Sequence, residues 1–95
     1  MEFEWDSKKE QINISKHGID FKTAICVFED SEYELLFDNV HSSEEDRYIA
    51  IGRIKNKDYL VCVVFTERKN RYRIITARRA GKEEEVRYYD SKKNN

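Results

Sequence analysis

The fold is decided by the stretch YLVCVVFTERKNRYRIITARRA, residues 59–80. Its first half, Tyr59–Glu67, begins with an unbroken apolar run, which is typical of a central strand that is covered on both faces. Its second half, Arg71–Arg78, also has the length of a strand, and Lys69 with Asn70 forms a plausible two-residue turn between them. The stretch therefore predicts an antiparallel hairpin at the centre of a sheet.

The two-residue turn also predicts where the basic side chains of the hairpin point. It places Arg68 opposite Arg71 and puts Arg73 on the same face, so three guanidinium groups converge at one end of the sheet. In an unbroken strand Arg79 shares this face and Arg78 points to the other. We expect one of these last two arginines to pair with a helix carboxylate and the other to face a ligand, and the sequence does not decide which.

Helices and further strands are predicted before and after the hairpin in the chain. Asp6 and Asp20 are suited to cap two helices, and an acidic first turn after Gly81 favours a third. The predicted elements in chain order are helices over 7–16 and 20–28, strands over 33–38, 47–54, 59–67 and 71–78, and a helix beginning near residue 83. The prediction is an α+β domain with two N-terminal helices, a four-stranded antiparallel meander sheet and a C-terminal helix.

Length and composition favour a single cytoplasmic domain. The 95 residues contain no proline, three glycines and no repeat, so we expect one domain over residues 1–90 and a disordered tail over 91–95. The acidic start has no signal-peptide pattern, and no apolar run is long enough for a membrane span. Cys26 and Cys62 lack metal-ligand spacing and are expected to be buried small hydrophobic residues.

Charge is distributed very unevenly along this nearly neutral chain. Residues 68–82 hold seven basic side chains and no acidic one, while the other eighty residues hold eleven basic and nineteen acidic side chains. A basic strip of this kind is typical of a surface that binds phosphate groups, because phosphate contacts depend on local charge rather than on net charge. The alternative is a solvated face without a ligand.

Several side chains are candidates for proton transfer beside such a strip. RNA supplies its own nucleophile, the 2′-hydroxyl, so RNA cleavage needs a base, an acid and nearby cations, and no metal ion is obligatory. The candidates are His17, His41 and Glu67 and, with lower expectation, Lys16, Tyr48 or Tyr72. Each has a structural alternative: His17 stabilises a helix end, His41 is a loop residue, and Glu67 forms an ion pair.

Other chemistries find no support in the sequence. The two histidines are twenty-four residues apart and belong to no metal-ligand motif, and the chain has no glycine-rich phosphate loop and no nucleophile elbow. We therefore expect neither a metal site nor a cofactor.

Taken together and in order, these residues resemble the BrnT family. The segments that carry the resemblance are FEWD at 3–6, KHGI at 16–19, RYIAIG at 47–52, TER at 66–68 and RIITARRA at 73–80, with Asp38, His41, Ser42, Glu45, Glu84 and Tyr88. The resemblance implies a ribonuclease toxin of a bacterial type II toxin–antitoxin pair with a RelE-like fold. It also implies a BrnA-type ribbon-helix-helix antitoxin as partner, with operator DNA bound only through that antitoxin. One departure is Gly81, where the family often has a Ser or Thr helix cap.

The resemblance and the chemistry together give a set of expected site residues. Expected catalytic residues are Glu67, Arg68, Arg79, His17 and His41, and expected RNA-binding residues are Arg71, Arg73, Arg78, Lys16 and Lys69. The predicted function is metal-independent RNA cleavage through attack of the 2′-hydroxyl. Two alternatives remain open: a non-catalytic basic binding module, and a decayed toxin that acts only as antitoxin partner and co-repressor.

Overall fold

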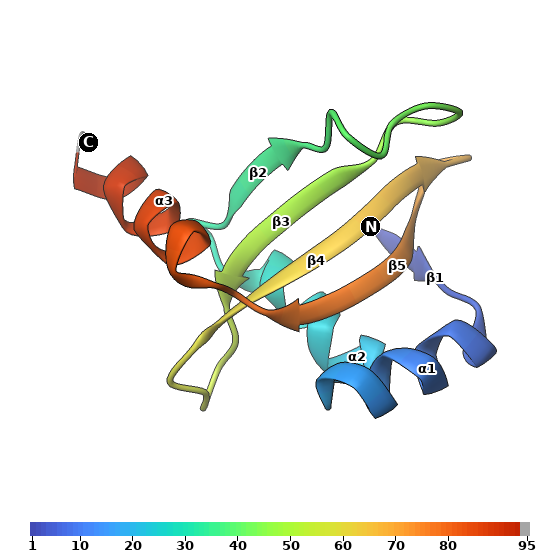
Figure 1. Cartoon of the computed structure of the whole chain (residues 1–95), viewed down its shortest axis with the longest axis horizontal. Helices are drawn as coiled ribbons and strands as arrows, with labels where there is room; N and C mark the ends of the chain where they lie inside the picture. The colour runs from blue at the N-terminus through green and yellow to red at the C-terminus, as the bar shows by residue number, and fades with distance from the viewer. Residues whose placement is uncertain (94–95) are drawn as a thin grey trace.

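A computed structural model describes residues 1–93 as three helices, a short 3-10 helix and one five-stranded sheet (Figure 1). The strands lie in the order β1-β5-β4-β3-β2. The elements are β1 Glu2–Glu4, α1 Ser7–His17, α2 Phe21–Ala24, η1 Ile25–Glu29, β2 Glu34–Phe37, β3 Tyr48–Arg53, β4 Leu60–Arg68, β5 Arg71–Arg79 and α3 Lys82–Lys93. The α+β class, the central β4–β5 hairpin and the antiparallel order of the last four strands are as predicted from the sequence.

The prediction of a four-stranded antiparallel sheet is wrong in one respect, because the chain begins with a fifth strand. β1 pairs in parallel with the start of β5, with Glu2 opposite Arg71 and Glu4 opposite Arg73, so the sheet is mixed. A three-residue strand is too short to show an alternating pattern in a sequence. Its pairing brings two glutamates beside two arginines of the hairpin, which matters for the site.

The predicted helix caps are confirmed. The side chain of Asp6 accepts hydrogen bonds from the backbone amides of Lys8 and Lys9, and Gly18 ends α1 with a φ of 70°, a left-handed conformation in which glycine is favoured. Asp20 caps α2 in the same way through Thr23. The second helix is α-helical only to Ala24, and a 3-10 helix over Ile25–Glu29 continues it one residue beyond the predicted end at Phe28.

One face of the sheet, which we call the helical face, carries the main hydrophobic core. Val61, Val63 and Phe65 of β4 point to this face and pack with Phe21 and Val27 from the helices. Aromatic rings extend the core, with the Phe65 ring centroid 4.6 Å from that of Tyr72. Trp5, which precedes α1, also packs against this cluster.

The other face, which we call the open face, has a smaller core at one end. Leu60, Cys62 and Ile51 are buried there beneath Tyr88 of α3. In Figure 1 α3 lies apart from the pair α1 and α2, which agrees with this separate packing. The expectation that both faces of β4 are covered is therefore met near Leu60 and Cys62.

The start of α3 compensates for the missing Ser or Thr cap. Glu84, the third residue of the helix, accepts a hydrogen bond from the backbone amide of Gly81 over 2.6 Å. This contact is one half of a capping box, in which the side chain at the third helical position satisfies the amide of the capping residue.

A β-bulge in the hairpin changes the predicted side-chain directions. The turn is formed as predicted, with positive φ at Lys69 and Asn70, and Arg68 pairs with Arg71. The register then slips, because Phe65 lies opposite Ile74 whereas Val64 lies opposite Thr76. The extra residue reverses the alternation beyond it.

The consequence falls on the two consecutive arginines. Arg78 lies opposite Cys62 on the open face, and Arg79 lies opposite Val61 on the helical face. The expectation that Arg79 shares the face of Arg73 is therefore wrong, because it assumed an unbroken strand.

Helix α1 is joined to the sheet by the side chain of Asn13, which makes the two hydrogen bonds that a neighbouring strand would otherwise make. The buried Asn13 donates from Nδ2 to the carbonyl of Ala77 over 2.8 Å and accepts from the Ala77 amide over 3.0 Å. These are the backbone groups that a neighbouring strand satisfies in a sheet. Asn13 also donates to the carbonyl of Ile19, so one amide group ties together α1, its following loop and β5.

The remaining predictions concern the C-terminus, the membrane and the cysteines. Helix α3 extends through Lys93 and so includes residues 91–93 of the expected tail, while residues 94 and 95 lie outside the described residues. In residues 1–93, no helix has the length and apolarity to cross a bilayer. Cys62 is buried and Cys26 is partly exposed, and both are free thiols.

Candidate functional site

Two adjoining hollows on the open face form the candidate site. The first, of about 330 Å³, lies between α1 and β5, and the second, also about 330 Å³, lies between β5 and the loop that joins β2 to β3. They share Arg47, Ile75 and Thr76 in their linings and therefore adjoin, and we call the two hollows together the central groove. The slipped part of β5 forms its floor.

The C-terminal end of α1 forms one wall of the central groove. Lys16 and His17 line it with Asn13, and both charged side chains come from the last turn of the helix. Cations are favoured at this position because the helix dipole is negative there. The helix end thus accounts for the presence of both residues, and their exposure leaves them accessible to a ligand in the groove.

The β2–β3 loop forms another wall and presents the second histidine. His41 Nδ1 lies 3.0 Å from Asp38 Oδ2, and its side chain is 64% exposed. Ser42 holds the loop closed by accepting from the amide of Arg47 and donating to the carbonyl of Asp38. The contact with Asp38 leaves Nε2 of His41 as the ring nitrogen free for proton exchange.

The charge state of Asp38 suits its role as the group that orients the ring of His41. Burial acts to raise its pKa, but hydrogen bonds from the His41 ring and from backbone amides outweigh it, so the pKa of Asp38 lies below its ordinary value. The carboxylate therefore stays ionised near neutral pH and orients the imidazole.

Arg47 belongs to both hollows and was missed by the sequence analysis. It stands before β3, outside the basic strip that drew attention to residues 68–82. Within residues 1–93, its guanidinium has no ion pair with a carboxylate. Its position in the alternation of β3 was the available signal, because Tyr48 faces the helical core and its predecessor therefore faces the groove.

The arginines at the hairpin end are paired with carboxylates and do not form the open clamp that was expected. Arg68 binds Glu45 with two hydrogen bonds, from Nε over 2.8 Å and from Nη2 over 2.6 Å. Arg71 contacts Glu2 over 3.1 Å, and Arg73 contacts Glu4 over 2.9 Å. The glutamates of β1 account for two of these pairs, which explains why a sequence analysis without that strand left the arginines unpaired.

The structure also assigns the two consecutive arginines. Arg78 lines the groove and makes a two-bonded ion pair with Glu84, at 3.0 and 2.8 Å, so it is the one that pairs with a helix carboxylate. The hydrogen bond from Arg78 is the main cause that lowers the pKa of Glu84 to about 2. Arg79 instead lies over the ring of Tyr59, with the guanidinium carbon 4.5 Å from the ring centroid.

Other expected site residues lie outside the central groove. Glu67 pairs with Tyr72 in the ladder and points to the helical face, away from Arg68. Lys69 occupies the exposed hairpin turn. The groove therefore brings together Lys16, His17, His41 and Arg78 of the expected residues, and separates them from Glu67, Lys69 and Arg79.

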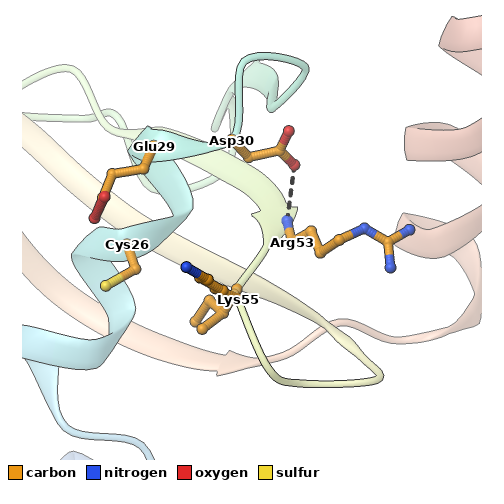
Figure 2. Close-up of a pocket in the computed structure, with 6 residues that line it drawn as sticks. Cys26, Glu29, Asp30, Arg53 and Lys55 are labelled. Atoms are coloured by element: carbon orange, nitrogen blue, oxygen red, sulfur yellow. Dashed lines mark hydrogen bonds between the residues drawn. The ribbon is translucent and has the colours of Figure 1, made fainter.

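A larger hollow elsewhere on the molecule has a different character. It has a volume of about 510 Å³ and lies beside η1 and the end of β3, where Figure 2 shows Cys26, Glu29, Asp30, Arg53 and Lys55 around it. Asp30 is already occupied, since it accepts hydrogen bonds from the Arg53 amide and the Tyr88 hydroxyl. This hollow contains no imidazole, so its size alone does not make it the reactive site.

Within residues 1–93, no group of three or more His, Cys, Asp or Glu side chains is arranged to hold a metal ion.

Fold and site together define a small α+β domain whose sheet carries a groove lined by imidazole and guanidinium groups. The model of the family described as "Ribonuclease toxin, BrnT, of type II toxin-antitoxin system" matches residues 5–84. The chain therefore belongs to the BrnT family of ribonuclease toxins of type II toxin–antitoxin systems, as the sequence resemblance indicated.

A solved structure supports this assignment. The crystal structure of the Brucella abortus ribonuclease toxin, BrnT, is similar to this chain with a TM-score of 0.61 and 26% sequence identity. The match covers 86% of this chain and 99% of the Brucella chain. Among curated proteins, none matches the sequence significantly.

Proposed function

We propose that this protein is a metal-independent endoribonuclease that cleaves RNA at the central groove through attack of the 2′-hydroxyl. The observation that carries the proposal is that a hollow lined by His17 adjoins a hollow lined by His41, and that Arg47 lines both. Membership of a family of ribonuclease toxins supports the reaction class. The groove supports the location, because it gathers groups that exchange protons and groups that stabilise phosphate charge.

The chemistry needs one base and one acid, and the groove offers an imidazole for each. His41, oriented by Asp38, accepts the proton of the 2′-hydroxyl as its oxygen attacks the adjacent phosphorus. His17 donates a proton to the departing 5′-oxygen. The P–O5′ bond breaks, and the products are a 2′,3′-cyclic phosphate and a 5′-hydroxyl. The histidines exchange these roles if the RNA lies in the opposite direction.

The cations of the groove stabilise the negative charge that develops on phosphorus. Arg47 is the best placed, since its guanidinium is not committed to a carboxylate ion pair within residues 1–93. Lys16 adds a second positive charge from the end of α1, whereas Arg78 shares its charge with Glu84. Arginine is suited to this task because it stays charged and presents a planar fork of donors to phosphate oxygens.

The pH dependence of cleavage tests the proposal. Purified protein should cleave a defined RNA with and without EDTA, and end-group analysis should find a 2′,3′-cyclic phosphate and a 5′-hydroxyl. The rate should follow a bell-shaped curve against pH, and each of His17→Ala and His41→Ala should remove one limb of it. His17→Ala and His41→Ala proteins that retain both limbs would contradict the assignment, and loss of cleavage in EDTA would contradict metal independence.

The partner follows from the same family membership. We propose a BrnA-type antitoxin with a ribbon-helix-helix domain that covers the central groove and binds operator DNA on behalf of the complex. The RelE-like character of the fold stays a prediction. Hydrogen exchange of the groove backbone, compared between free and antitoxin-bound protein, should show protection at Thr76 and around His41. Protection confined to the helical face would contradict this placement.

A further inference from the structure

The strongest ion pair at the hairpin end has the geometry of a phosphate contact. Both oxygens of the Glu45 carboxylate are held by Arg68, through Nε at 2.8 Å and Nη2 at 2.6 Å. This parallel, two-bonded arrangement is the one by which arginine binds phosphate oxygens. Glu45 thus occupies the position that a phosphate of a bound polyanion would take on Arg68.

Further positive charge surrounds the Glu45 carboxylate. Hydrogen bonding from Arg68 is the main cause that lowers the pKa of Glu45, and the charges of Arg68, Arg47 and Arg73 add to it. One carboxylate therefore lies in the field of three guanidiniums. Arg47 also lines the central groove, so this cluster is continuous with the proposed reactive site.

An unpartnered hydroxyl lies in the same row of side chains. Thr66 is fully buried, lies opposite Arg73, and precedes Arg68 by two residues on the same face of β4. Its Oγ1 makes no hydrogen bond with any residue in 1–93. Buried hydroxyls nearly always have a hydrogen-bond partner, so Thr66 is an exception in the row of side chains that carries Arg68.

Among the described residues, the Glu45 carboxylate has a single partner, and its neighbours in the chain are exposed. Within residues 1–93, the carboxylate of Glu45 has hydrogen bonds and an ion pair only with Arg68, and the neighbouring Glu44 and Asp46 are exposed. Half of the Arg68 side chain is exposed to solvent, so water and salt screen the pair. A phosphate group of an RNA chain therefore competes with Glu45 on favourable terms.

We propose that Arg68 and Arg47 form a phosphate-binding subsite beside the central groove, and that Glu45 closes it in the free protein as a displaceable substitute for an RNA phosphate. This inference rests on the proposed function and deepens it. RNA displaces the Glu45 carboxylate, one phosphate takes over the two donors of Arg68, and the chain then runs past Arg47 into the groove.

Binding of a non-cleavable RNA tests this inference separately from catalysis. The probe is a 2′-O-methyl oligoribonucleotide, titrated at a series of NaCl concentrations against the wild type, Glu45→Gln and the matched control Glu44→Gln. Glu45→Gln should bind about tenfold more tightly and increase the salt slope by about 0.7, the value for one additional phosphate contact on a single strand. Glu44→Gln removes the same charge from an exposed neighbour and should change affinity less than about twofold.

A second variant shows whether the gain acts through Arg68. In the Glu45→Gln/Arg68→Ala double variant the tighter binding should disappear. Equal binding by the Glu45→Gln and Glu44→Gln proteins would overturn the proposal, as would weaker binding by Glu45→Gln, which would mean that Glu45 positions Arg68 for its ligand. A gain in affinity for poly-glutamate without a gain for RNA would also overturn it, in favour of an acidic protein partner.

The outcomes separate this inference from the proposed function. Tighter RNA binding by Glu45→Gln in a protein that never cleaves RNA would support the subsite and reject the ribonuclease mechanism. Cleavage by the wild type together with indistinguishable binding by the two variants would support the mechanism and reject the subsite.

Discussion

The two faces of the sheet are built on different principles, although the same strands supply both. The helical face is closed by aromatic and aliphatic packing, with Phe65 in ring contact with Phe28, Tyr48 and Tyr72. The open face has a hydrophobic core only beneath α3, and farther along β4 and β5 it carries arginines held by glutamates. Apolar packing contributes more to stability than exposed ion pairs do. Stability therefore depends mainly on one face, which leaves the other free to bind and react.

The comparison predicts its largest effect for a core aromatic residue. Phe65→Ala should lower the free energy of unfolding by about 3–5 kcal/mol, because Phe65 is 2% exposed and its removal leaves a cavity among three rings. Urea denaturation measures the change. Phe37→Ala is the matched control, since this ring at the β2 edge is 46% exposed and its loss should have a much smaller effect. Similar losses for both variants would mean that the helical face is not the main source of stability.

The second prediction compares one arginine from each face. Arg47→Ala should reduce RNA cleavage about 100-fold, the usual loss when one stabilising donor is removed from a reactive site. Its urea midpoint should stay near that of the wild type. Arg79→Ala, on the helical face over Tyr59, should reduce cleavage only slightly. A greater loss for Arg79→Ala than for Arg47→Ala would place the reactive site on the helical face.

The third prediction concerns the hydrogen bonds by which Asn13 joins α1 to β5. Asn13→Ala should lower the free energy of unfolding by about 1–3 kcal/mol, because the amide and carbonyl of Ala77 lose their partners. Hydrogen exchange at the Ala77 amide should accelerate as well. Gln11→Ala, an exposed position on the same helix, is the control and should leave both measurements unchanged. Unchanged exchange at Ala77 in Asn13→Ala would show that the amide is protected by other means.

The smallest effect on the free energy of unfolding is expected from lowering the pH. The pKa of Glu84 lies at about 2 in the folded protein against an ordinary value of 4.5, so the unfolded state binds this proton more readily. The Arg78–Glu84 pair therefore stabilises the fold fully above pH 4.5, and this contribution is lost as the pH falls toward 2. It should amount to roughly 1 kcal/mol, since solvent screens a partly exposed pair.

Urea midpoints measured across this acid range test the contribution of the pair. Glu84→Gln should flatten that part of the pH profile, and Glu83→Gln, at an exposed neighbouring position, should not. Parallel profiles for Glu84→Gln and the wild type would contradict the assignment to this pair.

The elements of the fold were predictable wherever local chemistry determines them. The caps Asp6 and Asp20, the turn at Lys69 and Asn70, and the doubly covered strand β4 all follow from short-range rules and were predicted correctly. Strand β1 was missed because three residues show no period, and its pairing depends on partners 69 residues away in the chain. The bulge was missed for a related reason. The mixture of apolar and basic residues in β5 is compatible with either direction of the side chains after Ile74, so the sequence does not reveal the extra residue.

The candidate site was predicted less well than the fold. His17, His41 and Lys16 were singled out by their chemistry, and the structure places them around one groove. Arg47 was not recognised from the sequence because it lies outside the continuous basic strip, while proximity on the surface is set by the order of the strands. The ion pairs of the hairpin end were equally hidden, because their glutamates come from distant segments of the chain.

The bulge in β5 gives the Arg78–Arg79 doublet a further meaning. Deleting Ile75 would remove the bulge and keep Thr76 opposite Val64, because the bulge is the one residue by which β5 exceeds its partner strand at this point. Arg78 would still lie opposite Cys62 and reach Glu84, and Arg79 would still lie opposite Val61 and over Tyr59. The bulge thus makes the attachment of α3 through Arg78 tolerant of a deletion at this position, a tolerance that a regular strand would not provide.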